Sequence, residues 1–121
     1  MSDPAELDDI ELDAEDAKLV TLARTARARN AAAEGAAVRD DTGRTYVATS
    51  VELPSLAVSA LQAAVVMAVA SGAAGLEAAA IVSSSGQVGE HDRAIVADLN
   101  AAAPIFLAGI DGVVTAALTP S

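Results

Sequence analysis

Three stretches of the chain place apolar residues at helical spacing. Residues 18–29 carry apolar side chains at positions 19, 22, 23 and 26, which lie on one face of a helix. Asp13, followed by Asp16 three positions later, is typical of an N-cap with an acidic first turn. Residues 56–70 are apolar almost throughout and end at Ser71-Gly72, and residues 90–99 alternate at helical spacing. The pattern therefore predicts three helices.

Five further runs have the length and composition of strands. Residues 35–39 and 44–51 are separated by Asp40-Asp41-Thr42-Gly43, whose Asp and Gly residues supply the turn conformations of a hairpin. Within 77–83, the run 78–82 is apolar on both faces and predicts a buried central strand. The last two runs, 104–108 and 113–118, are joined by too few residues for a crossover helix, so they are antiparallel.

The predicted order is helix, hairpin, helix, strand, helix, hairpin. A mixed sheet with helices on both faces buries every apolar stripe in this order. We therefore expect an α/β protein of three-layer α/β/α architecture. Its five-stranded mixed sheet has an N-terminal hairpin and a C-terminal antiparallel strand pair. The many alanines require the layers to pack closely, because small side chains leave no room for loose packing.

The net charge of −10 is concentrated at the N-terminus. Residues 3–16 hold eight acidic residues and no basic one, which leaves a net charge of −2 for the remainder. Such a segment is typical of disorder, so we divide the chain into an acidic disordered tail, residues 1–16, and a folded domain, residues 17–121. The alternative is that the tail folds back on Arg24, Arg27 and Arg29, which are more simply interpreted as a solvated helix face.

Composition excludes several classes of function. The chain has no Cys and a single His, His91, so it offers no disulfide, no thiolate metal site and no Cys nucleophile. It lacks the basic surface that general nucleic-acid binding needs, and anionic lipid would repel it. The uncharged run 53–76 is rich in Ala, Ser and Gly, which favours a buried helix over a membrane span. No secretory signal opens the chain, so we expect a cytoplasmic protein.

Several local strings, taken in order, resemble the small cytidine deaminases. Gly35-Ala36-Ala37-Val38, with Asp41-Thr42-Gly43-Arg44, resembles the first hairpin of that family, and Ser50-Val51-Glu52 resembles its Asn-Val-Glu segment. Ser59-Ala60-Leu61 resembles the start of the helix that begins Cys-Ala-Glu, and residues 107–113 resemble the last turn of the family. The likeness covers roughly residues 17–119 and implies the same three-layer fold.

The resemblance implies a zinc-dependent deaminase site, but this chain lacks its ligands. In that family a His or Cys and two further Cys hold zinc, and a Glu moves protons to and from the metal-bound water. The corresponding ligand positions here are Ser59, Gly89 and Asp92, and Leu61 stands where the catalytic Glu is expected. We therefore predict no catalytic residue, no metal ligand and no cofactor.

The chain also lacks some of the substrate-binding residues that the resemblance implies. Ser50 replaces the Asn of the ribose-binding Asn-x-Glu segment, and Glu52 is retained. Ala replaces the aromatic residue expected between positions 30 and 34 to stack on the base. Nucleoside binding through Ser50 and Glu52 is therefore expected to be weak, and Glu52 is equally well interpreted as an acid at the end of a strand.

Two other groups of residues offer alternative interpretations. Glu90, His91 and Asp92, with Ser59, form a candidate oxygen-rich metal site or unorthodox catalytic centre. Against this, acidic residues are common at a helix N-terminus, where the helix dipole and free N–H groups favour them. Residues 83–86 match the serine content of a phosphate loop but lack its Lys and Gly spacing, which favours an ordinary flexible loop.

The helix predicted over 56–70 indicates self-association. Its Ala, Val and Met side chains cover nearly all sides, more than one sheet face buries, and in the resembled family this helix lies near the centre of a homotetramer. We expect a homo-oligomer, a dimer or tetramer. The functional prediction is a zinc-free pseudoenzyme with a binding, assembly or regulatory role, for which a protein partner is one candidate. The alternative is a cytidine or deoxycytidine deaminase, or another nucleoside hydrolase, with an unorthodox centre.

Overall fold

The computed structural model describes residues 11–120 and begins with helix α2, Ala14–Asn30. The Asp13 side chain caps this helix by accepting a hydrogen bond from the backbone N–H of Asp16 at 2.8 Å, as the sequence predicts. Residues 14–16, which we had placed in the acidic tail, therefore form the first turn of the helix. Most of that predicted tail, residues 1–10, lies outside the described residues.

The predicted five-stranded mixed sheet is confirmed. Its order is β2-β1-β5-β6-β7, and only the β5–β6 pair is parallel. The β1–β2 hairpin is the expected N-terminal pair, and β6–β7 is the expected C-terminal antiparallel pair. The strand bounds are Glu34–Asp40 for β1, Thr45–Thr49 for β2, Leu76–Ser83 for β5, Ile105–Ala108 for β6 and Val114–Leu118 for β7.

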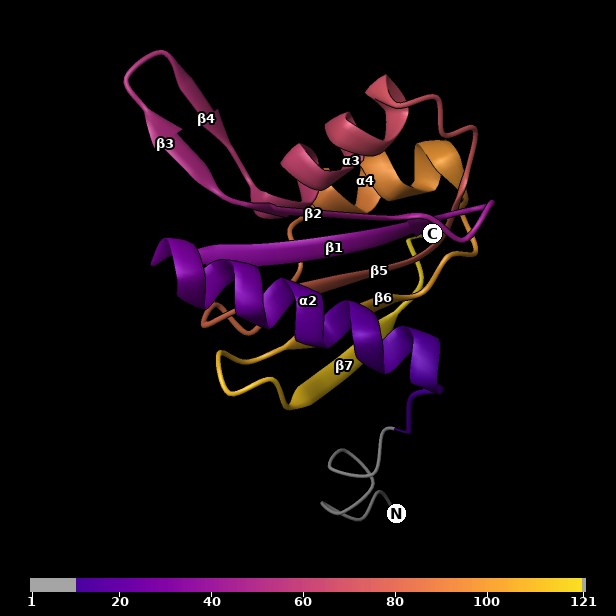
Figure 1. Cartoon of the computed structure of the whole chain (residues 1–121), viewed down its shortest axis with the longest axis horizontal. Coiled ribbons are helices and arrows are strands. Elements are labelled where there is room, and N and C mark those ends of the chain that lie inside the picture. Colours follow the sequence, from indigo (N-terminus) through magenta and orange to yellow (C-terminus); the bar gives the residue numbers. More distant parts are fainter. Residues whose placement is uncertain (1–10, 121) are drawn as a thin grey trace.

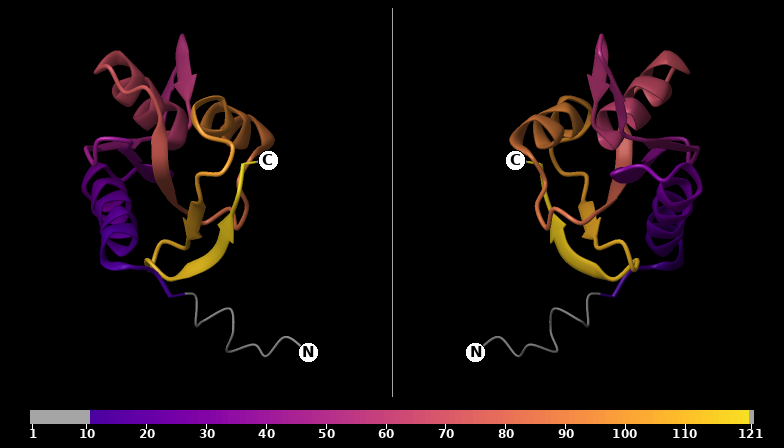
Figure 2. Two further views of the ribbon diagram at one scale, coloured as in Figure 1. Left: turned by 90° about the vertical axis from the view of Figure 1, so that its right-hand side faces the viewer. Right: turned by 90° about the vertical axis from the view of Figure 1, so that its left-hand side faces the viewer.

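Helices cover both faces of this sheet and give the predicted three layers. Helix α2 packs on one face (Figure 1), where Leu19, Val20 and Ala23 are buried against alternate residues of β1 and β5. Helices α3, Ala60–Ala70, and α4, Glu90–Leu99, lie together on the other face, as Figure 2 also shows. The continuous apolar run of β5 is buried because it contributes to both cores, as expected for a central strand.

Close packing of α2 on β1 requires Gly35. A Cβ atom at this position would collide with the carbonyl oxygen of Ala23 and would lie 2.9 Å from the Cβ atom of Arg27. The small residues in these layers therefore permit the short distance between helix and sheet that the alanine content predicts.

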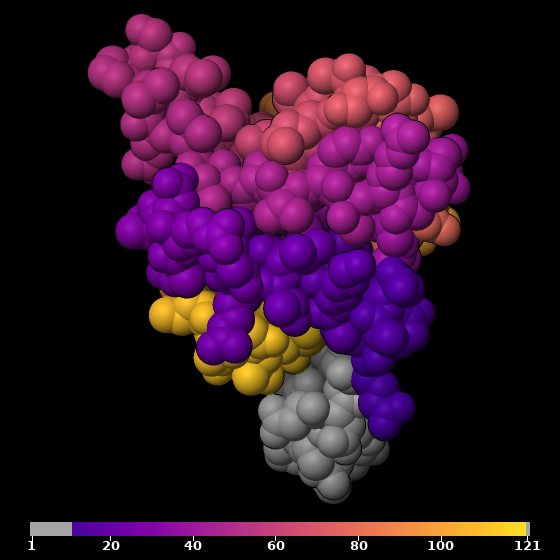
Figure 3. Space-filling model, in the orientation of Figure 1, coloured from indigo at the N-terminus to yellow at the C-terminus, as the bar shows by residue number. Residues whose placement is uncertain are grey.

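Two elements differ from the prediction between residues 50 and 60. The structure forms a separate hairpin of β3, Val51–Leu53, and β4, Leu56–Val58, where we expected the end of one strand and the first turn of a helix. The helix begins instead at Ala60, because the Ser59 side chain caps it. The hairpin projects from the body of the molecule (Figure 3), and Leu53 and Leu56 at its tip are exposed.

The long uncharged segment 53–76 is thus divided among a strand hairpin, a helix and a loop. No helix within the described part of the chain has the length and apolar character needed to cross a bilayer.

Candidate functional site

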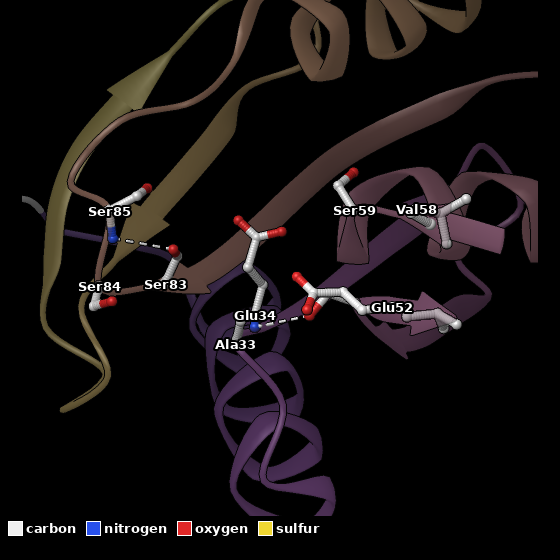
Figure 4. A pocket seen from close by; sticks show the side chains of 11 residues that line it. Ala33, Glu34, Glu52, Val58, Ser59, Ser83, Ser84 and Ser85 are labelled. Atoms are coloured by element: carbon white, nitrogen blue, oxygen red, sulfur yellow. Dashed lines mark hydrogen bonds between the residues drawn. The ribbon is translucent and has the colours of Figure 1, made fainter. Parts of the chain in front are cut away.

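A cleft of about 460 Å³ opens at the end of the sheet where β5 finishes and β1 begins (Figure 4). Because β1 and β5 are antiparallel, the first residue of β1, Glu34, lies beside the last residue of β5, Ser83. The β3–β4 hairpin and the start of α3 form the opposite wall. The lining residues are Ala33, Glu34, Ser50, Val51, Glu52, Ala57, Val58, Ser59, Ser83, Ser84 and Ser85.

Ser59 joins the starts of α3 and α4. Its hydroxyl donates a hydrogen bond of 2.7 Å to Oδ1 of Asp92, in the first turn of α4. The same oxygen accepts from the backbone N–H of Gln62 at 3.0 Å, and the Gln62 side chain accepts from the Ser59 N–H at 2.8 Å. These bonds form a capping box, so the hydroxyl is used both as a donor and as an acceptor.

Glu34 enters the cleft from the first position of β1, and reasoning from the sequence missed it. Its backbone is held on both sides by Ser50: the Glu34 N–H donates to Ser50 Oγ at 3.1 Å, and the Ser50 N–H donates to the Glu34 carbonyl at 3.1 Å. The Glu34 carboxylate lies by the first turn of α3, with Oε1 3.4 Å from the backbone nitrogen of Ala60. The only feature of the sequence that distinguishes Glu34 is that it is a single acidic residue at the start of an apolar strand.

The structure brings some predicted site residues together and separates others. Ser50, Glu52 and Ser59 line the cleft, and Asp92 reaches it through its hydrogen bond to Ser59. Leu61 is fully buried in the core on the α3 side of the sheet. Gly89, the N-cap residue of α4, is exposed and does not line this cleft.

The residues present do not fit a zinc ion of the deaminase type. The chain has no Cys, and its single imidazole, on His91, is exposed and outside the lining of the cleft. The hydroxyl of Ser59 and the carboxylate of Asp92 are hydrogen-bonded to each other. Within residues 11–120, no three His, Cys, Asp or Glu side chains are grouped so as to hold a metal ion, so the alternative of an oxygen-rich centre at Glu90, His91 and Asp92 is not assembled there.

The serine loop after β5 forms the third wall of the cleft. The Ser83 hydroxyl accepts a hydrogen bond from the Ser85 N–H at 3.1 Å, and the Ser85 hydroxyl donates to the Gln87 carbonyl at 3.0 Å. These bonds within residues 83–87 fit the interpretation of an ordinary polar loop rather than a phosphate loop.

The opposite end of β1 carries a buried carboxylate with a purely local role. The Asp40 side chain accepts hydrogen bonds from the Thr42 hydroxyl at 2.7 Å, from the backbone N–H groups of Thr42 and Arg44, and from the Tyr46 hydroxyl. These bonds, that of the Thr42 hydroxyl foremost, lower the pKa of Asp40 to about 2. Asp40 thereby stabilises the predicted β1–β2 turn, at the far end of the strand from the cleft.

Comparison with known proteins identifies the family. The family model described as "Cytidine deaminase-like" matches residues 12–112. The fold is similar to that of a cytidine deaminase from Burkholderia pseudomallei, with a TM-score of 0.75 and 22% identity over 85% of this chain and 91% of that one. A cytidine deaminase from Mycobacterium leprae has a TM-score of 0.70 and 21% identity over 91% and 95% of the two chains.

None of the curated protein sequences matches this chain. At 21–22% identity, the structural likeness establishes the fold alone. The function has to be argued from the residues of the cleft. The family match covers most of the sequence, including every residue that lines the cleft and every element before β7. On this evidence, the chain belongs to the cytidine deaminase-like family.

Proposed function

We propose that this chain is a non-catalytic member of its family, a zinc-free pseudoenzyme whose cleft serves binding or regulation. The observation that carries the proposal is the 2.7 Å hydrogen bond between Ser59 and Asp92. These two residues stand at positions where the resemblance implies zinc ligands, and here they are hydrogen-bonded directly to each other. The bond supports a site in which direct contact between two helix starts has taken the structural role of an ion.

The chemistry of the remaining positions supports the same proposal. Zinc-dependent deamination needs a metal-activated water and a carboxylate that moves its protons. Leu61, at the position implied for that carboxylate, has no ionisable group and is buried in the core. Gly89 offers no side-chain ligand at all. Without the zinc ligands and without this carboxylate, the chain has neither the group that activates the water nor the group that moves its protons.

A deamination assay with metal analysis tests the proposal. We expect no loss of the ultraviolet absorbance of cytidine or deoxycytidine, with or without added zinc, and no stoichiometric metal in protein purified without chelator. Turnover that Ser59→Ala or Asp92→Ala abolishes would overturn the proposal in favour of an unorthodox deaminase or other nucleoside hydrolase. Glu15→Ala, an exposed site outside the cleft, is the matched control for purity and folding.

A vestigial nucleoside site is the binding role that the lining residues support best. Ser50 and Glu52 lie in the wall of the cleft and correspond to the ribose-binding segment implied by the resemblance. A ligand that binds only the folded state raises the midpoint of thermal unfolding, and the rise grows with the ratio of ligand concentration to Kd. We expect cytidine to raise that midpoint at high concentration, and Glu52→Ala to remove the effect. An unchanged midpoint in the original protein at saturating cytidine would refute this role.

We also propose that the protein is a homo-oligomer, a dimer or tetramer, that associates through the outer face of α3. Val66 is 62% exposed there, and Met67 and Val69 are also exposed, which leaves an apolar helix face uncovered within one chain. Light scattering should show a multiple of the chain mass, which Val66→Glu reduces and the control Ala28→Glu on α2 does not. A monomer at all concentrations would refute the proposal.

A cytoplasmic location, testable by cell fractionation, fits a chain without cysteine.

A further inference from the structure

The lining of the cleft carries acidic side chains and no basic one. Two of its lining residues, Glu34 and Glu52, are acidic, and none is Lys, Arg or His. Its volume of about 460 Å³ is within the range of small-molecule sites. The remaining polar groups of the lining are serine hydroxyls and backbone groups, which are neutral. A ligand in the cleft therefore meets the carboxylates of Glu34 and Glu52, and that of Asp92 behind Ser59.

Glu34 is held so that its carboxylate faces the inside of the cleft. The reciprocal backbone bonds with Ser50 fix its main chain, and Figure 4 shows its side chain extending between Ser83 and Ser59. Glu52 reaches toward the same space from the β3–β4 hairpin (Figure 4). One backbone N–H, that of Ala60, contacts the Glu34 carboxylate, at a long 3.4 Å. Most of the acceptor capacity of this carboxylate is thus free for a ligand.

We infer that the cleft takes a small molecule that carries a protonated amine, and that Glu34 is the residue that selects it. The inference rests on the proposed binding function of the cleft. A charge pair about 4 Å apart contributes roughly fivefold in binding even at the dielectric constant of water, and more in a cleft from which water is displaced. The same field disfavours phosphorylated ligands, because their charge has the sign of the two carboxylates.

Cytidine and two derivatives that differ from it only at the 5′ position test this inference. Cytidine is neutral there, 5′-amino-5′-deoxycytidine carries a cation, and cytidine 5′-monophosphate carries an anion. We expect the amine to bind at least about tenfold more tightly than the monophosphate at low salt, with the neutral form between them and the difference shrinking at high salt. Calorimetric titration of the full-length protein gives the three Kd values directly.

Glu34→Gln should reduce the ratio of the amine and monophosphate Kd values by about fivefold. It keeps the size of the side chain and an oxygen to face the Ala60 N–H. Glu15→Gln removes the same charge at an exposed position of α2 outside the cleft and should leave the ratio unchanged. Thermal unfolding of both variants verifies that they are folded.

The outcomes separate this inference from the proposed function. Equal Kd values for the three compounds would overturn the inference, and so would a ratio of the amine and monophosphate Kd values that Glu34→Gln does not change. In either case, binding without turnover would still support the proposed function. Absence of binding by all three would overturn both the inference and the nucleoside role. Deamination of cytidine together with the expected Kd order would overturn the pseudoenzyme proposal and support the role of Glu34.

Discussion

Breaking the link between Ser59 and Asp92 should cost measurable stability, because it joins two helices at a partly buried position. Ser59→Ala removes the N-cap of α3, worth about 1 kcal/mol, and the bond to the Asp92 carboxylate. A hydrogen bond to a charged group contributes about 1.5–3 kcal/mol when well buried, and partial exposure reduces this to about 1 kcal/mol. We therefore expect Ser59→Ala to lower the free energy of unfolding by about 2 kcal/mol.

A double-mutant cycle isolates the part of this loss that belongs to the link. Asp92→Ala alone should cost about 1 kcal/mol, and the double variant should cost about 1 kcal/mol less than the sum of the single changes. Urea denaturation measures each free energy of unfolding, provided that the m-value stays constant. The control cycle pairs Ser59→Ala with Glu90→Ala, which removes an acid from the same first turn of α4.

The reasoning is refuted if the Ser59–Asp92 cycle is additive. A coupling energy below about 0.3 kcal/mol is typical of independent sites and would mean that the two side chains do not interact in solution. The control cycle should be additive within about 0.5 kcal/mol, because no hydrogen bond joins Ser59 to Glu90. The proposal that this link takes the place of a metal ion also predicts that added zinc leaves all of these free energies unchanged.

Three further predictions follow from the fold. Gly35→Ala should lower the free energy of unfolding by about 1–3 kcal/mol in a denaturant titration, because the new methyl group collides with the Ala23 carbonyl; unchanged stability would show that α2 moves away freely. The pKa of Asp40 falls from 3.8 when unfolded to about 2 when folded, so its stabilising effect is complete above pH 4 and is lost as the pH falls toward 2. Asp40→Asn should flatten this acid limb of the stability–pH curve, and an equally steep limb would assign it to other carboxylates. Leu61→Glu should restore no deamination in the ultraviolet assay and should lower the midpoint of thermal unfolding, because it buries a charge in the core; a gain of activity would contradict the assignment of this position.

The secondary structure was largely predictable because local signals agree with the fold. Asp13 marks the start of α2, the Asp40–Gly43 turn joins β1 to β2, and the apolar run within β5 identifies the central strand. The short final connection was enough to make β6 and β7 antiparallel. These features depend on neighbours within a few residues, so the sequence pattern contains them.

The β3–β4 hairpin was not predictable in the same way. Residues 56–58 are apolar in a pattern that suits the first turn of a helix as well as a short strand. The choice is made by the local Ser59–Gln62 capping box together with contacts from elsewhere: Glu34 holds Ser50, and Asp92 holds the Ser59 hydroxyl. Contacts between residues 16 and 33 positions apart therefore add to the local cap in setting the boundaries of the hairpin and the helix.

The sequence by itself determined the order of the three helices and of the five strands of the main sheet, the three layers, and the absence of the thiol ligands that zinc-dependent deamination requires. It also singled out Ser50, Glu52, Ser59 and Asp92. Only the tertiary structure decided that Ser59 and Asp92 bind each other and that Glu34 faces the cleft. The reason is that antiparallel pairing of β1 with β5, and the packing of α3 beside α4, bring together side chains whose separation along the chain carries no local signal.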